Sequence, residues 1–126
     1  MFVGVARLVL QIPGARSLKD RRRVVKGFKD RARARLPVSV AEVGNAELYQ
    51  HATVGVAVVS SSSQRCSEIL SAAATLARGA SGAILADVAT EIVSFGEGDR
   101  GIRGGIEQAL DRGADAGWDD EDEELE

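Results

Sequence analysis

Nine Lys or Arg residues and only two Asp lie among the twenty residues 17–36, SLKDRRRVVKGFKDRARARL. Ammonium and guanidinium groups neutralise phosphates, and a dense set of them on one surface is typical of proteins that bind nucleic acids. A helix face that only contacts water usually carries charges of both signs. This segment is therefore either a surface for an anionic partner or the solvated side of an ordinary amphipathic helix.

A helix over this segment would place most of the cations on one flank. At 100° per residue, the apolar residues fill one sector, which should face the core, and six cations fill the neighbouring sector. The apolar set is Leu18, Val24, Val25, Phe28, Ala32 and Leu36. The six cations, which we call the basic flank, are Lys19, Arg22, Arg23, Lys26, Lys29 and Arg33. Because like charges four residues apart repel each other, we favour an RNA-binding flank over a plain solvated face.

Arg21 departs from this pattern, because it falls in the middle of the apolar sector. A charge there needs a partner. Glu42 is the nearest candidate in the sequence, since it interrupts the otherwise apolar segment 38–44, VSVAEVG. We expect a structural ion pair between Arg21 and Glu42, or alternatively an Arg21 side chain that snorkels past the edge of the sheet.

The loop before this helix offers a second candidate for anion binding. Free backbone N–H groups at the helix N-terminus, together with Arg16 and Ser17, would suit a single anion. The alternative is that Ser17 only caps the helix.

Motifs for catalysis are absent from the sequence. It contains no P-loop, no dinucleotide-binding glycine pattern and no paired His and Cys cluster for a metal. We expect the single histidine, His51, at the surface and the single cysteine, Cys66, in the core. We therefore predict a protein that is not an enzyme and uses no cofactor. With one cysteine and no apolar run near the ~20 residues of a membrane span, it is expected in the cytoplasm without membrane contact.

The elements that position these residues follow from periodicity and turn signals. Strands are expected over residues 2–12, 38–44, 52–60 and 83–95, with one helix from Ser17 to about Arg35 and another from the serine run 60–63 to Arg78. The order β-α-β-β-α-β predicts an α+β, ferredoxin-like sandwich, in which a four-stranded antiparallel sheet carries two helices on one face. Because the fourth strand is long, we expect a bend or bulge in it.

The net charge of −3 divides unevenly along the chain. Residues 1–96 carry 13 Lys or Arg against 7 Asp or Glu, a net charge of +6, whereas residues 97–126 carry 3 against 12, a net charge of −9. The second segment is also rich in glycine and ends in the acidic run DDEDEELE. We predict a basic domain over 1–96 and a flexible, acidic tail over 97–126.

The two central strands are apolar on both faces. When helices cover one face of an antiparallel sheet, the other face is usually polar and exposed to water. Homodimerisation is the simplest way to cover this one, and the acidic tail or a partner protein are alternatives. The central strands offer only one aromatic residue, Phe2, so base stacking on the sheet is not expected and RNA contacts should be to phosphates.

The segment SLKDRR at 17–22, followed by VSVAEVG at 38–44, resembles the YlxP-like family of small bacterial proteins. The resemblance extends over about residues 1–95, and the family-typical positions are Ser17, Leu18, Lys19, Arg22, Glu42 and Val43. It implies a ferredoxin-like fold and a bacterial cytoplasmic protein of unknown function. Genes of that family often neighbour translation factors and the ribosome-binding factor RbfA, which implies an association with ribosomes.

Two main hypotheses follow from the sequence. The first is a dimeric, non-enzymatic RNA- or ribosome-associated protein, an accessory factor of translation or ribosome assembly that contacts phosphates through the basic flank. The alternative is a protein–protein interaction module that uses the apolar sheet face and the acidic tail, with a solvated basic helix. A weaker reading is a regulatory domain that binds a small anion in the Arg16 loop.

Overall fold

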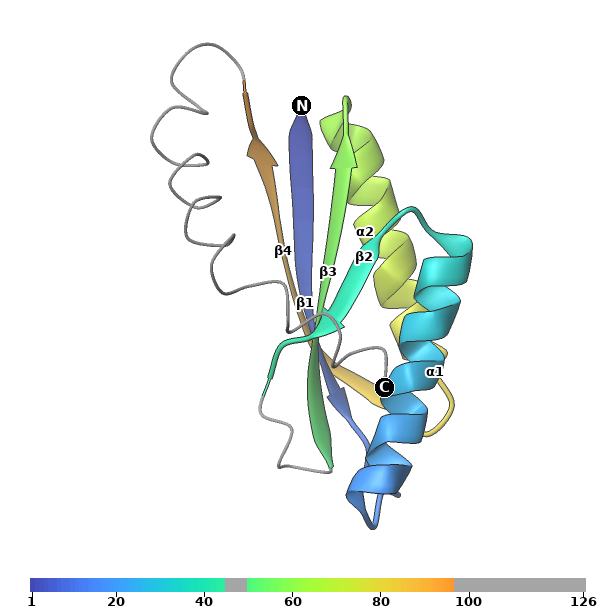
Figure 1. Cartoon of the computed structure of the whole chain (residues 1–126). Helices are drawn as coiled ribbons and strands as arrows, with labels where there is room; N and C mark the ends of the chain where they lie inside the picture. Colours follow the sequence, from blue (N-terminus) through green and yellow to red (C-terminus); the bar gives the residue numbers. More distant parts are fainter. Residues whose placement is uncertain (45–49, 97–126) are drawn as a thin grey trace, which may run out of the picture. The chain divides into compact units, whose positions relative to one another are not determined.

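The structure, a computed structural model, describes residues 1–44 and 50–96. Its elements are β1 (Phe2–Gln11), α1 (Leu18–Arg35), β2 (Ser39–Glu42), β3 (His51–Ser60), α2 (Ser63–Arg78) and β4 (Ile84–Ser94). The sheet has the order β2-β3-β1-β4 and all its pairings are antiparallel, while both helices lie on one face of it (Figure 1). This is the ferredoxin-like sandwich that the element order predicts.

The expected bulge lies near the start of β4. Val9 of β1 pairs with Asp87, but the next residue, Leu10, pairs with Leu85, so Ala86 has no opposite residue in the ladder. The central strand β1 pairs with β3 on one side and with β4 on the other along its whole length. β2 is shorter than the predicted 38–44, because its ladder with β3 is confined to Ser39–Glu42.

Local signals explain where the helices begin and end. The Ser17 hydroxyl accepts a hydrogen bond from the backbone N–H of Asp20 at 3.2 Å and caps α1, and Ser62 caps α2 in the same way. α1 ends at Arg35 because Leu36 is extended, the conformation that a following proline favours. Gly82, with φ at +82°, makes the turn into β4, a conformation that L side chains rarely adopt.

One core lies between the sheet and the helices. Alternate residues of the central strands face it, among them Leu8 and Val54, and they meet apolar residues of both helices, including Phe28 and Cys66. A Cβ atom at Gly4 would lie 3.0–3.1 Å from three side-chain atoms, which shows how closely α2 approaches β1. Leu18 is a correction to the predicted apolar face, since it is exposed; burial in α1 begins one turn later, at Arg21.

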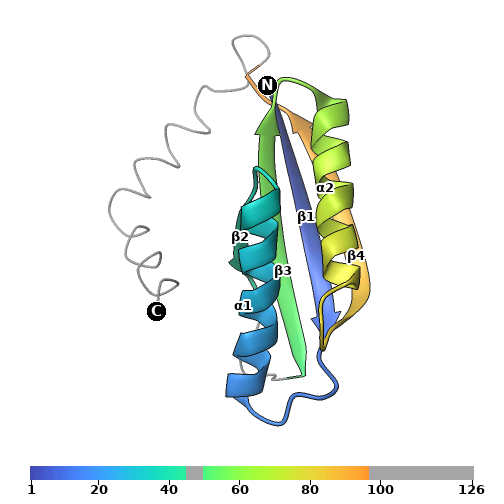
Figure 2. The ribbon, with the colours of Figure 1, turned by 90° about the vertical axis from the view of Figure 1, so that its right-hand side faces the viewer.

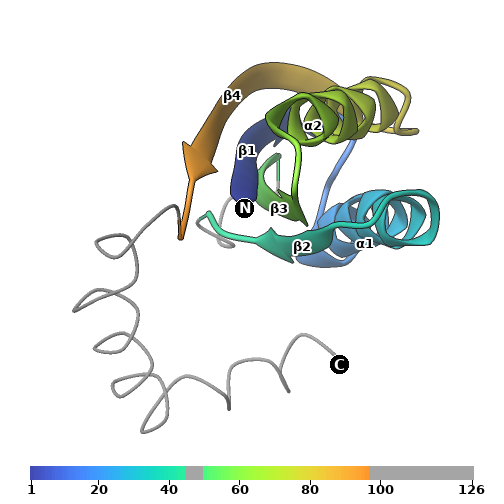
Figure 3. The ribbon, with the colours of Figure 1, turned by 90° about the horizontal axis from the view of Figure 1, so that it is seen from above.

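The face of the sheet without helices carries apolar side chains on all four strands. Three of the eight exposed large hydrophobic residues lie on it, since their strand neighbours on either side in sequence face the helices: Val5, Val59 and Val93. We call this surface the outer face; Figure 3 shows that both helices lie on the opposite side. Its charged residues include Arg7 and Asp87, whose side chains form an ion pair at 3.8 Å.

Met1–Ser94 forms one compact unit. The predicted flexible tail, 97–126, lies outside the described residues and stays a prediction. No helix in the described part of the chain is long and apolar enough to cross a membrane.

Candidate functional site

Helix α1 presents a basic surface on the side that faces away from the sheet. It lies beside α2, and its core side packs on β2 and β3 (Figure 2). Arg21 is its only buried cation, so eight Lys or Arg residues and two Asp remain at or near the surface of α1. The accessible part of the helix therefore has a net charge of +6.

Three members of the predicted basic flank are engaged by neighbouring groups. Arg23 forms an ion pair with Asp20 at 3.6 Å, and Lys26 donates to Asp30 at 2.6 Å. Arg33 donates from Nη2 to the backbone carbonyl of Val40 at 2.6 Å. That last bond joins the end of α1 to β2, so Arg33 has a structural role in addition to its charge.

The other three members are Lys19, Arg22 and Lys29. Lys19 and Arg22 are exposed, and Lys29 is half-buried. Within the ranges that the structure describes, none of the three forms an ion pair. They lie along one side of the helix, over ten residues or ~15 Å at 1.5 Å per residue. The structure thus divides the basic flank into three cations engaged by neighbouring groups and three cations that form no ion pair. We call the second set the cations with free charge.

The cations of α1 affect the pKa of the Asp30 carboxyl. The hydrogen bond from Lys26 lowers the pKa of the Asp30 carboxyl, and the positive charges of Lys26, Arg33 and Lys29 lower it further. The carboxylate is largely exposed, and a desolvation effect acts in the opposite direction, raising its pKa. The lowered pKa therefore reflects mainly the contact with Lys26, and the more distant cations add to it.

Arg21 lies beneath α1 and contacts two strands. Its Nη1 donates to Glu42 Oε1 at 3.2 Å, its Nη2 pairs with Glu42 Oε2, and its Nε donates to the backbone carbonyl of His51 at 3.0 Å. Only 2% of the residue is exposed. Burial, with a smaller effect from the neighbouring Arg22, lowers the pKa of Arg21. The ion pair expected between Arg21 and Glu42 is therefore present, and Arg21 does not reach the solvent-facing flank.

The loop before α1 does not offer the open anion site considered for Arg16 and Ser17. The Ser17 hydroxyl is used as the cap, and the Asp20 carboxylate accepts a hydrogen bond from the backbone N–H of Arg16 at 3.0 Å. A carboxylate thus lies where the anion was expected, and it would repel one. The geometry favours the alternative in which Ser17 only caps the helix.

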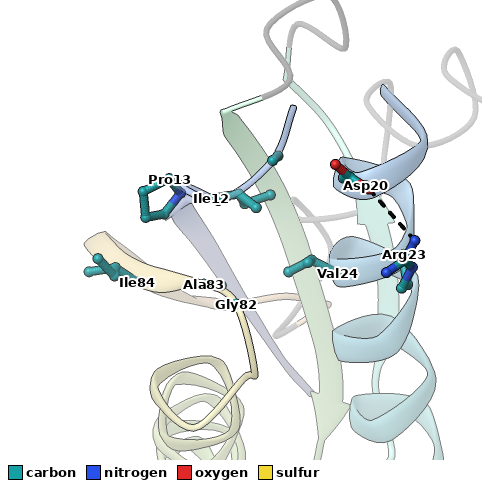
Figure 4. Close-up of a pocket in the computed structure, with 10 residues that line it drawn as sticks. Ile12, Pro13, Asp20, Arg23, Val24, Gly82, Ala83 and Ile84 are labelled. Carbon is teal, nitrogen blue, oxygen red and sulfur yellow. Dashed lines mark ion pairs between the residues drawn. The ribbon is translucent and has the colours of Figure 1, made fainter. Parts of the chain in front are cut away.

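A pocket of about 500 Å³ lies at the same end of the sandwich, between the loop after β1 and the loop before β4 (Figure 4). Apolar groups line most of it, including Ile12, Val24 and Ile84, while Asp20 and Arg23 supply its charges. It was not predicted from the sequence, because its lining comes from α1 and from two loops far apart in the chain. The signal was Pro13-Gly14 and Gly82, turns that the topology places at one end of the sheet.

Residues that could support other chemistry are isolated from one another. Cys66 is buried and packs in the core, and its thiol lies 3.8 Å from the carbonyl of Phe2. His51 is exposed at the start of β3. No group of three or more metal-ligating side chains lies together in residues 1–44 and 50–96.

The fold defines a small α+β domain, and its helix α1 carries a basic surface. The chain belongs to the family described as "Protein of unknown function (DUF503)", whose model matches residues 3–90. That description does not name the YlxP-like proteins, so the narrower resemblance stays a prediction.

Among the solved structures that match is the C-terminal segment of the alpha subunit of aIF2 from Pyrococcus abyssi. Its sequence is 11% identical, the TM-score is 0.41, and the match covers 78% of this chain and 52% of that chain. The match therefore spans about half the length of that structure, and the similarity is one of fold alone. No curated protein matches the chain.

Proposed function

We propose that this protein is a non-enzymatic, cytoplasmic RNA-binding protein, an accessory factor of the ribosome or of its assembly that contacts phosphates through α1. The observation that carries the proposal is the set of three cations with free charge, Lys19, Arg22 and Lys29, on a helix surface with a net charge of +6. A polyanion would neutralise this surface, whereas the two acids on α1 offset only part of it. The ribosomal part rests on the sequence resemblance.

The mode of binding should be sequence-tolerant. Phe2 packs against the core, and in the described part of the chain the outer positions of the central strands carry one aromatic ring, that of His51 at the start of β3. A single ring at a strand end offers little base stacking, and phosphate contacts carry no base information by themselves.

The test is co-sedimentation with ribosomes, together with binding to a single-stranded homopolymer RNA. Changing Lys19, Arg22 and Lys29 together to Glu should abolish both. The matched control changes Arg7, Arg65 and Arg78 to Glu, which alters the net charge by the same amount away from α1. If the control loses binding equally, net charge rather than this surface is responsible. If the flank variant still binds, the proposal is wrong.

Salt provides a second test of the same proposal. Three cations of the basic flank, Lys19, Arg22 and Lys29, would contact phosphates, because the other three are engaged by Asp20, Asp30 and the Val40 carbonyl. With ~0.7 counterions released per contact on a single strand, log K should fall with log salt at a slope of about −2. A slope near zero would contradict binding through phosphates.

The outer face favours a second function, that of a protein–protein interaction module, with a second copy of the chain as the expected partner. Val59, 63% exposed, lies across from Val3 at one end of this apolar surface. Val59→Asp should turn a dimer into a monomer in analytical ultracentrifugation. Leu18→Asp, at an exposed apolar residue on α1, is the control and should leave the dimer intact. A wild-type monomer at all concentrations would exclude homodimerisation.

A further inference from the structure

The free edge of β4 is the longest unpaired strand edge in the described part of the chain. β4 pairs only with β1, over Ile84–Ser94, and the opposite edge strand, β2, has four residues. About half of the backbone N–H and C=O groups of a strand edge point away from its neighbour and need a partner or water. β4 contains no proline and no lysine, the residues that commonly protect such edges, and its bulge is confined to Ala86 near its start.

A groove runs beside this edge on the helix side of the sheet. Val88, Thr90 and Ile92, three alternate residues of β4, form its floor, and Ile92 remains 37% exposed. Its wall is a row of small side chains on α2, Ser67, Ser71 and Thr75, which are spaced four residues apart. Because these side chains are small, α2 leaves the helix-side face of β4 partly uncovered.

The size and lining of the groove indicate what it would hold. Its volume of about 230 Å³ is below the ~300–1,000 Å³ of small-molecule pockets. A strand paired to β4 would place alternate side chains over the groove, ~6.8 Å apart, in register with its three floor residues. Backbone pairing and side-chain contacts would then be satisfied together, as in β-strand addition.

The charge of the groove favours a segment of another protein over a second copy of this chain as its occupant. Arg78 lies at one end of the groove, and none of the other residues lining it is charged. A carboxylate on the incoming strand would complement Arg78. A second β4 has no acid on its helix-side face, since Asp87 and Glu91 lie on the outer face. Two copies would therefore leave Arg78 without a countercharge.

We propose that the β4 edge and the β4–α2 groove bind an extended segment of a partner protein. The segment carries small apolar or hydroxyl side chains at alternate positions and an acidic residue that reaches Arg78. This site lies on β4 and α2, whereas the basic flank lies on α1. The proposal can therefore be tested independently of RNA binding.

The experiment selects peptides from a phage-displayed random library of about 12 residues on the immobilised full-length protein, since strands of about 5–6 residues fit within that length. Enriched peptides should alternate small side chains and share an acidic residue. On binding, amide hydrogen exchange should slow in β4 and not in α1. Strand pairing should protect the β4 amides on the free edge, since those that face β1 are already hydrogen-bonded.

Two matched pairs of variants localise the contact. Ser71→Phe fills the groove from an exposed helix position and should abolish binding, whereas Gln64→Phe, on α2 outside the groove, should not. Arg78→Glu should weaken binding of the acidic peptides by about two- to fivefold, as expected for an exposed charge pair. Arg65→Glu should leave their affinity unchanged. An unaltered circular dichroism spectrum confirms the fold of each variant.

Three results would overturn the proposal. The first is a selection without enriched peptides. The second is a bound peptide that protects amides outside β4. The third is a dimer of the free protein that Ser71→Phe dissociates, which would identify a second copy of the chain as the occupant.

Discussion

The guanidinium of Arg21 and the carboxylate of Glu42 meet beneath α1 in a two-pronged ion pair. The same guanidinium donates to the carbonyl of His51, so one side chain joins α1 to β2 and β3. This fixes the rotation of α1 on the sheet and thereby directs the basic flank toward solvent. The ion pair thus helps to orient the proposed RNA-binding surface, although neither of its residues belongs to that surface.

Replacing Glu42 by Gln should destabilise the protein by about 3 kcal/mol, because the buried Arg21 charge would lose its countercharge. We take the lower end of the range for buried pairs, since the Glu42 side chain is partly exposed. Urea unfolding followed by circular dichroism measures the change. The double variant Arg21→Met with Glu42→Leu should be closer to the wild type, because it removes both charges. Equal losses in the two variants would show that packing, and not charge, is responsible.

Replacing Arg33 by Ala should lower the free energy of unfolding by about 1 kcal/mol, because it removes the hydrogen bond to the Val40 carbonyl. The affinity for RNA should change less than in Lys29→Ala. Arg35→Ala, at a neighbouring exposed cation, is the stability control. If Arg33→Ala weakens RNA binding as much as Lys29→Ala and leaves stability unchanged, Arg33 belongs to the binding surface instead.

The stability of the protein should depend on pH through the Asp30 carboxyl. Its pKa is lowered in the folded state, chiefly by the hydrogen bond from Lys26. The carboxylate therefore adds stability above its unfolded-state pKa, and this contribution is lost as the pH falls through the folded-state pKa. Lys26→Gln should raise the pKa of Asp30 and reduce this acid-range dependence. Carboxyl ¹³C titration by NMR measures the shift, and Lys19→Gln, which does not contact Asp30, should leave the pKa nearly unchanged.

The acidic run at 119–126 should weaken RNA binding by electrostatics. It contains seven of the acids that give residues 97–126 a net charge of −9. Changing these seven Asp and Glu residues to Asn and Gln in the full chain should raise the affinity for homopolymer RNA at low salt. The gain should vanish at ~1 M salt, where the Debye length is ~3 Å. Equal affinity of the two chains at low salt would contradict this prediction.

Local patterns were enough to predict the elements and the fold. The serine caps, Pro13-Gly14, Pro37 and the apolar periodicities place the helices and strands close to their observed bounds, because caps and turns act over a few residues. The bulge in β4 follows from strand length alone. Leu18 was predicted wrongly, since a helical wheel gives the direction of a side chain and not whether the core extends that far.

The charges show what the amino-acid sequence determined and what required the tertiary structure. The sequence determines that α1 carries nine cations, that Arg21 lies on its apolar side and that the acids concentrate near the chain's end. Only the folded chain shows that Arg33 reaches Val40, that Asp20 occupies the supposed anion site, and that α2 leaves a groove beside β4. The reason is physical: hydrogen bonds and grooves depend on distances of a few ångströms between segments far apart in the chain, and packing sets those distances.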